Sequence, residues 1–189
     1  MALSGMRISV NHLNYIIPIT LVIIALLLYL NFRSIIEVAI LLGTLPLALI
    51  DSIWFMYWQG FNFSIAVGVG FIALAGVAVE IGVIMLVYLN QAYSRMQTER
   101  KDISQTITRQ DIQHAVVQGA AHRVRPVLMT TSATIVGLLP IMLDDGTGSE
   151  VMQRLATPMV GGMLSALFLS LLVLPAVYYL WKVRGGVED

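Results

Sequence analysis

Cysteine is absent from the 189-residue sequence, and charged residues are scarce. Without cysteine the chain can form neither disulfides nor thiolate metal sites. Charged residues make up 12% of the chain and hydrophobic residues 58%, against about 25% and about 45–50% in ordinary soluble domains. A soluble core of this size cannot bury so much apolar surface, because burial is limited by the ratio of surface to volume. The composition therefore predicts an integral membrane protein.

Other absences narrow the class of function. The formal net charge is zero, so no overall field favours nucleic acid or acidic partners. No Ser/His/Asp set, metal triad or phosphate-binding loop is evident, which disfavours an enzyme and predicts that no cofactor is held. Residues 1–14 contain one arginine and no long apolar run, so we interpret them as a periplasmic lead-in rather than a cleavable signal.

Five apolar runs are long enough to approach the roughly 20 residues that a membrane-spanning helix needs. They are Tyr15–Phe32, Ile35–Trp58, Ser64–Leu89, Pro126–Leu143 and Leu155–Trp181. The predicted fold class is thus an all-α integral membrane protein with five transmembrane helices. We divide it into residues 1–14, transmembrane helices one to three (15–89), a cytoplasmic connector (90–125), helices four and five (126–181) and a cytoplasmic tail (182–189).

The basic residues predict how the chain is oriented. Nine of the eleven fall in the connections on one side of the predicted spans: Arg33, Arg95, Arg100, Lys101, Arg109, Arg123, Arg125, Lys182 and Arg184. Only Arg7 and Arg154 lie on the other side. Because basic residues accumulate in cytoplasmic loops, we expect a periplasmic N-terminus and a cytoplasmic C-terminus.

The connector Asn90–Arg125 carries a helical pattern in its second half. Apolar and small residues recur at the spacing of one helix face: Ile112, Ala115, Val116, Gly119 and Ala120. Thr108 is a suitable N-cap, with Asp111 at the third helical position. We expect a short amphipathic helix on the inner membrane surface that leads into span four. Such a basic segment could instead bind lipid or a calmodulin-like partner.

Glu80 is the foremost candidate for a functional residue. A carboxylate inside a membrane helix costs about 2.5–3.5 kcal/mol on insertion scales, and Glu80 lies deep within the third span. Ala73 and Gly76 precede it on the same helix face, where small residues let another helix approach closely. The pattern predicts that Glu80 faces protein and can carry a proton, although a buried structural acid would give the same pattern.

Six further residues are candidates beside Glu80. Thr130 and Thr131 open span four and could pass a proton, or could simply bond their own helix. Met152 lies in a polar outer stretch, where its thioether could contact a soft metal ion. Asp51 lies two turns inside Trp58, so it can reach water. His114 and His122 are eight residues apart, too far to share one ion, and indicate a solvated surface.

Several motifs, in order, resemble heavy-metal-efflux pumps of the resistance-nodulation-division (RND) family. Gly70–Gly82 is similar to the tenth helix of these pumps, and Gly119–Thr130 resembles the signature that opens their eleventh helix. Gly137–Pro140, Gly146–Arg154 and Pro158–Met163 resemble the end of that helix and the twelfth. The likeness covers about residues 13–184, and Glu80 makes the copper/silver group the most similar.

The resemblance implies a fold and a function. The five spans would correspond to helices 8–12, the C-terminal part of a homotrimeric inner-membrane pump. Such pumps export Cu(I) or Ag(I) in exchange for protons, together with a periplasmic adaptor and an outer-membrane channel. The resemblance assigns Glu80 to the proton relay and Met152 to the metal path, and Thr130 resembles the relay threonine of drug-exporting RND pumps. Thr131, the next hydroxyl, is included in the predicted relay as an alternative to Thr130.

One departure from the copper/silver pattern leaves alternatives open. That group usually has lysine directly after the Arg-Pro pair, where this chain has Val127 after Pro126. Glu80 then lacks its expected cation. A hydrophobe- or drug-exporting RND relative and a truncated, non-transporting membrane fragment are the two competing interpretations.

Overall fold

The computed structural model describes residues 18–102, 107–144, 146, 148 and 149–186. Within these residues all regular structure is helical. The helices are Pro18–Phe32, α2 (Ile35–Trp58), α3 (Ile65–Asp102), α4 (Arg109–Met142), α5 (Ser149–Phe168), a π-helical turn (Leu169–Val173) and α6 (Leu174–Gly186). The described residues up to Ala39 form one compact unit, and those from Ile40 onward form another.

Four of the five predicted spans are confirmed as helices long and apolar enough to cross a membrane: Ile35–Trp58, Ile65–Lys101, Arg109–Met142 and Ser149–Arg184. The predicted first span differs. In the described residues it is the shorter apolar helix Pro18–Phe32, and residues 15–17 of the prediction lie outside them. At 1.5 Å per residue the described helix is about 22 Å long, less than the hydrocarbon thickness of about 30 Å.

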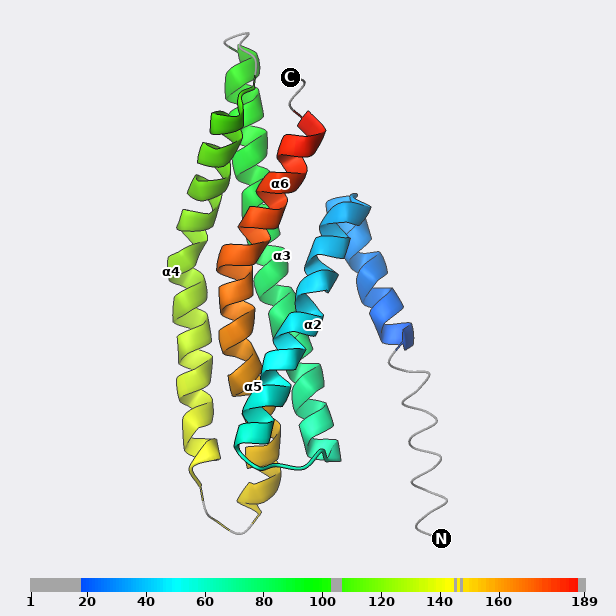
Figure 1. The fold of residues 1–189 in the computed structure, drawn as a ribbon, viewed down its shortest axis with the longest axis vertical. Helices are drawn as coiled ribbons and strands as arrows, with labels where there is room; N and C mark the ends of the chain where they lie inside the picture. The colour runs from blue at the N-terminus through cyan, green and yellow to red at the C-terminus, as the bar shows by residue number, and fades with distance from the viewer. Residues whose placement is uncertain (1–17, 103–106, 145, 147, 187–189) are drawn as a thin grey trace. The chain divides into compact units, whose positions relative to one another are not determined.

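The helices α3 and α4 extend well beyond the predicted spans and form a long antiparallel pair, with α5–α6 beside them (Figure 1). The amphipathic connector helix was predicted correctly as a helix, and Thr108 with Asp111 forms the expected capping box. The prediction of a separate short surface helix was wrong. Ile112, Ala115, Val116 and Gly119 are buried, and a Cβ on Gly119 would lie 3.0 Å from Ala92 of α3. The apolar face therefore packs on protein.

The last span is one continuous helical rod with a π-helical turn in its middle. The turn Leu169–Val173 joins α5 directly to α6. Pro175 follows it, and proline both lacks an N–H group and clashes with the carbonyl four residues earlier. A locally wider turn accommodates that clash without ending the helix.

Close glycine contacts join α3 and α5. A Cβ on Gly162 would lie 2.1 Å from the Leu74 side chain, and a Cβ on Gly70 would lie 2.5 Å from the Leu155 carbonyl oxygen. Only glycine permits such an approach. The largest fully buried side chains of the second unit include Leu41, Leu74, Met85, Leu86, Leu89, Met163, Leu174 and Tyr178. This packed interior fixes the rotation of α3 about its own axis.

Candidate functional site

Glu80 lies on the side of α3 that no other helix of residues 40–189 covers. Exposed residues follow this side at helical spacing, and we name them the Glu80 stripe: Ile65, Val69, Ile72, Gly76 and Glu80. A Cβ added to Gly76 would have no neighbour within 4 Å. The stripe is therefore open along most of the apolar length of α3.

The opposite side of α3 is packed tightly. Leu74 and Leu86 are completely buried there, and a Cβ on Gly82 would lie 2.5 Å from the Leu41 side chain. Since α3 cannot rotate without breaking these contacts, the outward direction of Glu80 is fixed by the packing behind it. One face of α3 is therefore exposed, while the opposite face of the same helix is tightly packed.

The carboxyl group of Glu80 has no hydrogen-bond or ion-pair partner among the described residues. The sequence predicts that this face contacts another helix, but no described helix of residues 40–189 lies against Gly76. A carboxylate on the hydrocarbon side of a membrane helix carries the penalty of about 2.5–3.5 kcal/mol noted above. The stripe therefore holds a carboxyl group for which hydrocarbon alone is an unfavourable neighbour.

The structure separates the two threonines that were predicted together. Thr130 is exposed, and its hydroxyl donates to the carbonyl oxygens of Pro126 at 3.2 Å and Val127 at 3.1 Å. Thr131 is 4% exposed, and its hydroxyl oxygen has no partner in the described part of the chain. Of the pair, Thr131 holds the unused buried hydroxyl, while Thr130 bonds its own helix.

Val127 of α4 lies just before Thr130 and Thr131 and packs against the α3 turn that contains Glu80. Val127 is buried in an apolar cluster with Ile81 of α3 and Leu167 of α5. Ile81 directly follows Glu80, and Thr131 lies one helical turn beyond Val127. The buried space beside the Glu80 turn is therefore filled by an apolar side chain from α4.

Met152 lies apart from these residues, in the first turn of α5, and is 57% exposed. Two polar contacts lie near it: the Gln153 amide donates to the Asp144 carbonyl oxygen at 2.6 Å, and the Asp144 carboxylate accepts from the Gly146 N–H. Among the described residues no group of three or more His, Cys, Asp and Glu side chains could hold a metal ion. Met152 is thus an accessible thioether at the start of α5.

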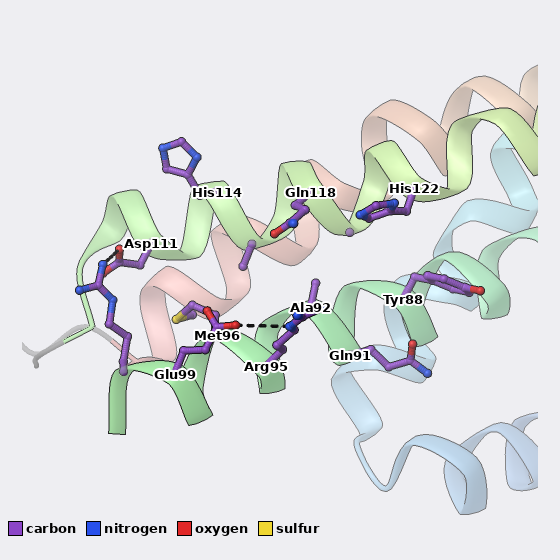
Figure 2. Close-up of a pocket in the computed structure, with 13 residues that line it drawn as sticks. Tyr88, Gln91, Ala92, Arg95, Met96, Glu99, Asp111, His114, Gln118 and His122 are labelled. Carbon is purple, nitrogen blue, oxygen red and sulfur yellow. Dashed lines mark hydrogen bonds and ion pairs between the residues drawn. The ribbon is translucent and has the colours of Figure 1, made fainter. Parts of the chain in front are cut away.

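The long α3–α4 pair encloses a groove of about 580 Å³ that the sequence did not predict. His114, Gln118 and His122 of α4 line it together with Tyr88 and Arg95 of α3, and Figure 2 shows the His114 ring pointing away from α3. Arg95 pairs with Glu99, and Arg100 pairs with Asp111. These pairs neutralise the groove, so it is not a built anion site.

Sequence reasoning also missed how α6 is held against α3. Tyr178 is fully buried and donates its hydroxyl hydrogen to the Asn90 side-chain oxygen at 2.6 Å. The Lys182 ammonium lies 4.6 Å from the ring centre of Tyr93 and 4.1 Å from that of Trp181. In the sequence, these contacts were indicated only by aromatic residues such as Tyr178 and Trp181 near the end of the last span.

Several apolar helices of spanning length and an intramembrane carboxyl group define a multi-pass membrane protein. The model of the AcrB/AcrD/AcrF family matches residues 3–182. The chain belongs to this family of efflux transporters.

Two relatives and one solved structure are similar to this chain. The chain is 48% identical to the putative cation efflux system protein SilA of Salmonella typhimurium, over 97% of this chain and 18% of that protein. It is 48% identical to the cation efflux system protein CusA of Escherichia coli K12, over 94% of this chain and 17% of that protein. A crystal structure of a heavy metal efflux pump matches with a TM-score of 0.71 at 37% identity, covering 89% of this chain and 15% of that one. The chain thus spans under a fifth of the length of these relatives.

Proposed function

We propose that this chain is the C-terminal transmembrane portion of an RND transporter that exports heavy-metal cations in exchange for protons. Glu80 is the group that binds and releases the proton. The observation that carries the proposal is the Glu80 stripe, an open membrane face with one unpartnered carboxyl group on an otherwise well-packed helix. Relatives named as cation efflux systems share 48% of the sequence.

The stripe suits a proton carrier for a physical reason. A carboxyl group that other helices cover, away from bulk water, gains or loses charge at a large free-energy cost, so protonation and helix packing become coupled. Small residues such as Ala73 and Gly76 let a covering helix approach closely. Thr131, with its unused buried hydroxyl, is the better candidate of the two threonines for passing the proton, directly or through water.

In the proposed assembly the covering helices come from the remainder of a homotrimeric pump, which works with a periplasmic adaptor and an outer-membrane channel. The protein lies in the bacterial inner membrane with the N-terminus of this segment periplasmic and its C-terminus cytoplasmic. Met152 is the thioether of this segment on the metal path. Its exposure of 57% leaves the sulfur free to join ligands from elsewhere in the pump.

A charge-removing substitution tests the proposal. In the full-length pump Glu80→Gln keeps the size and hydrogen bonding of the side chain but cannot ionise. We expect it to abolish copper and silver tolerance and proton-coupled metal flux in vesicles while trimer assembly remains normal. Glu150→Gln is the matched control, because it removes an exposed carboxylate outside the stripe. Metal export by Glu80→Gln at the parent rate would contradict the assignment.

Expression of the 189-residue chain alone separates the proposal from a self-contained transporter. We expect no metal tolerance in a pump-deleted strain, because the Glu80 stripe then has no cover. Restored tolerance would contradict this interpretation.

A hydrophobe-exporting relative is the second candidate. The observation that favours it is Val127, an apolar residue where the copper/silver group has lysine. Tolerance to copper, silver, zinc and cationic drugs, compared in one strain, distinguishes the two functions.

A further inference from the structure

A second polar feature in the apolar region lies on a different helix from Glu80. Asp51 of α2 lines a groove of about 680 Å³ between α2 and α5. We name this the Asp51 groove, and its walls are Trp54, Phe55, Tyr57, Trp58, Gly161 and Leu164. Trp54, Tyr57 and Trp58 are 70–83% exposed. The groove is therefore an open, largely aromatic surface with one carboxylate.

The sequence builds this groove through helical spacing and one glycine. Trp54, Phe55 and Trp58 follow Asp51 at three, four and seven residues, so they share its helix face. A Cβ on Gly161 would lie 2.5 Å from Phe55, so the absent side chain lets α5 approach the aromatic face. The buried Ser52 hydroxyl donates to the Pro158 carbonyl oxygen at 2.7 Å and holds the two helices together there.

The charge of Asp51 has no counterpart in the groove. No basic residue is among its lining residues, and Asp51 has no ion-pair or hydrogen-bond partner in the described parts of the chain. A carboxylate attracts a cation, and the faces of tryptophan and tyrosine rings attract organic cations in particular. A bare metal ion fits less well, because hard cations need several oxygen ligands and this groove offers one carboxylate.

The position of the groove indicates where such a cation comes from. Asp51 lies seven residues, or about 10 Å, along α2 from Trp58 at the helix end. Asp51 thus lies two helical turns below the aromatic end of α2, where aromatic residues mark the membrane interface, so a ligand that pairs with it enters from that surface. The groove walls belong to helices of membrane-spanning length, so where no other polypeptide covers them their neighbour in the bilayer is a lipid.

We propose that the Asp51 groove binds an aminophospholipid such as phosphatidylethanolamine. The ammonium of the head group pairs with the Asp51 carboxylate and lies against the tryptophan rings, while one acyl chain lies along Leu164 and Gly161. This site is separate from the proton carrier, and its occupancy anchors α2 and α5 at one bilayer surface. It does not depend on which ion the pump exports.

Photo-crosslinking in the full-length protein tests the site. The probes are phosphatidylethanolamine and phosphatidylglycerol with the same diazirine-bearing acyl chain, offered at equal concentration in nanodiscs and mapped by mass spectrometry of the labelled peptides. We expect the ethanolamine probe to label the α2 peptide around Asp51 and the α5 peptide around Leu164 about five-fold more than the glycerol probe, the effect of one ammonium–carboxylate contact.

Three variants sharpen the test. Asp51→Asn should equalise the two probes, whereas Asp51→Glu and the control Glu150→Gln should keep the preference. Equal labelling by both probes in the parent protein would overturn the proposal, as would a preference that survives Asp51→Asn. Absence of labelling in the full-length protein would also overturn it, because another part of the polypeptide then covers the groove. Metal export plays no part in the readout, so these outcomes are independent of the Glu80 assignment.

Discussion

Val127 of α4 packs against Ile81 of α3, the residue that follows Glu80. In the copper/silver group this α4 position usually carries lysine. The contact places the position beside the α3 turn that holds the proposed proton carrier, Glu80. Val127 is only 5% exposed, so a charge at this position has to be satisfied locally or remain buried.

Val127→Lys should therefore lower the unfolding temperature of the purified protein, because a buried ammonium is costly unless it is paired. Adding Glu80→Gln should lower that temperature further, since Glu80 is the nearest acid along α3. We expect a coupling free energy of about 0.5–1 kcal/mol from a double-mutant cycle in detergent. Val127→Met controls for the added length. Strictly additive effects would mean that the two positions do not communicate.

Two glycines on α3 should respond oppositely to alanine. A Cβ on Gly70 meets the Leu155 carbonyl oxygen at 2.5 Å, while one on Gly76 meets nothing within 4 Å. We expect Gly70→Ala to destabilise the chain by about 1–3 kcal/mol through overpacking. Gly76→Ala should be neutral, or stabilising by up to about 1 kcal/mol through its helix propensity. Thermal unfolding of the 189-residue chain measures both.

In the full-length pump, Gly76→Ala should nevertheless impair transport, because a methyl group would push away the helix that covers the Glu80 stripe. Unimpaired metal export by this variant would show that the stripe faces lipid and has no covering helix.

The tip of the α3–α4 pair should loosen in acid. The Thr108 side chain and backbone donate to the Asp111 carboxylate, and with Arg100 nearby they hold the Asp111 pKa below its ordinary value of 3.8. Asp111 lies outside the apolar part of α4. Since the folded-state pKa is lowered, the stabilisation is present above about pH 4 and is lost as the pH falls through the folded-state pKa.

Hydrogen exchange measures this effect in the first turn of α4. Protection there should decline below about pH 4 in the parent chain. In Asp111→Asn it should be weaker already at neutral pH and should show no such decline. Identical pH profiles for the two proteins would exclude Asp111 as the source.

The absence of cysteine makes the predicted orientation simple to test, because any introduced cysteine is unique. Glu150→Cys at the start of α5 and Thr98→Cys in the α3 extension are both at exposed positions. A membrane-impermeant maleimide added to spheroplasts should label Glu150→Cys, while Thr98→Cys should react only after the membrane is permeabilised. The reverse pattern would invert the topology.

Local pattern was sufficient for much of the fold. Apolar length predicted five spanning helices, four of which have spanning length in the structure, and the Thr108–Asp111 spacing predicted a helix start that the structure confirms. Both depend on residues close together in the chain: hydrophobic length is a property of one segment, and a capping box involves four consecutive positions.

Tertiary contacts decided the points at which the sequence predictions failed. The periodicity of Ile112, Ala115 and Val116 indicated an apolar face but could not say whether lipid or protein covers it, and α3 proved to be the cover. Likewise, Thr130 and Thr131 are adjacent in sequence, and only the rotation of α4 against its neighbours buries one hydroxyl and leaves the other exposed.

The sequence by itself determined that Glu80 is an acid within an apolar helix, since composition and position along the chain establish that. Only the tertiary structure decided the direction of its side chain and the meeting of Phe55 with Gly161 across two helices. The physical reason is that a helix buries whichever face gains most from close packing. In α3 the glycine contacts of Gly70 and Gly82 fix that face, and so turn Glu80 away from it.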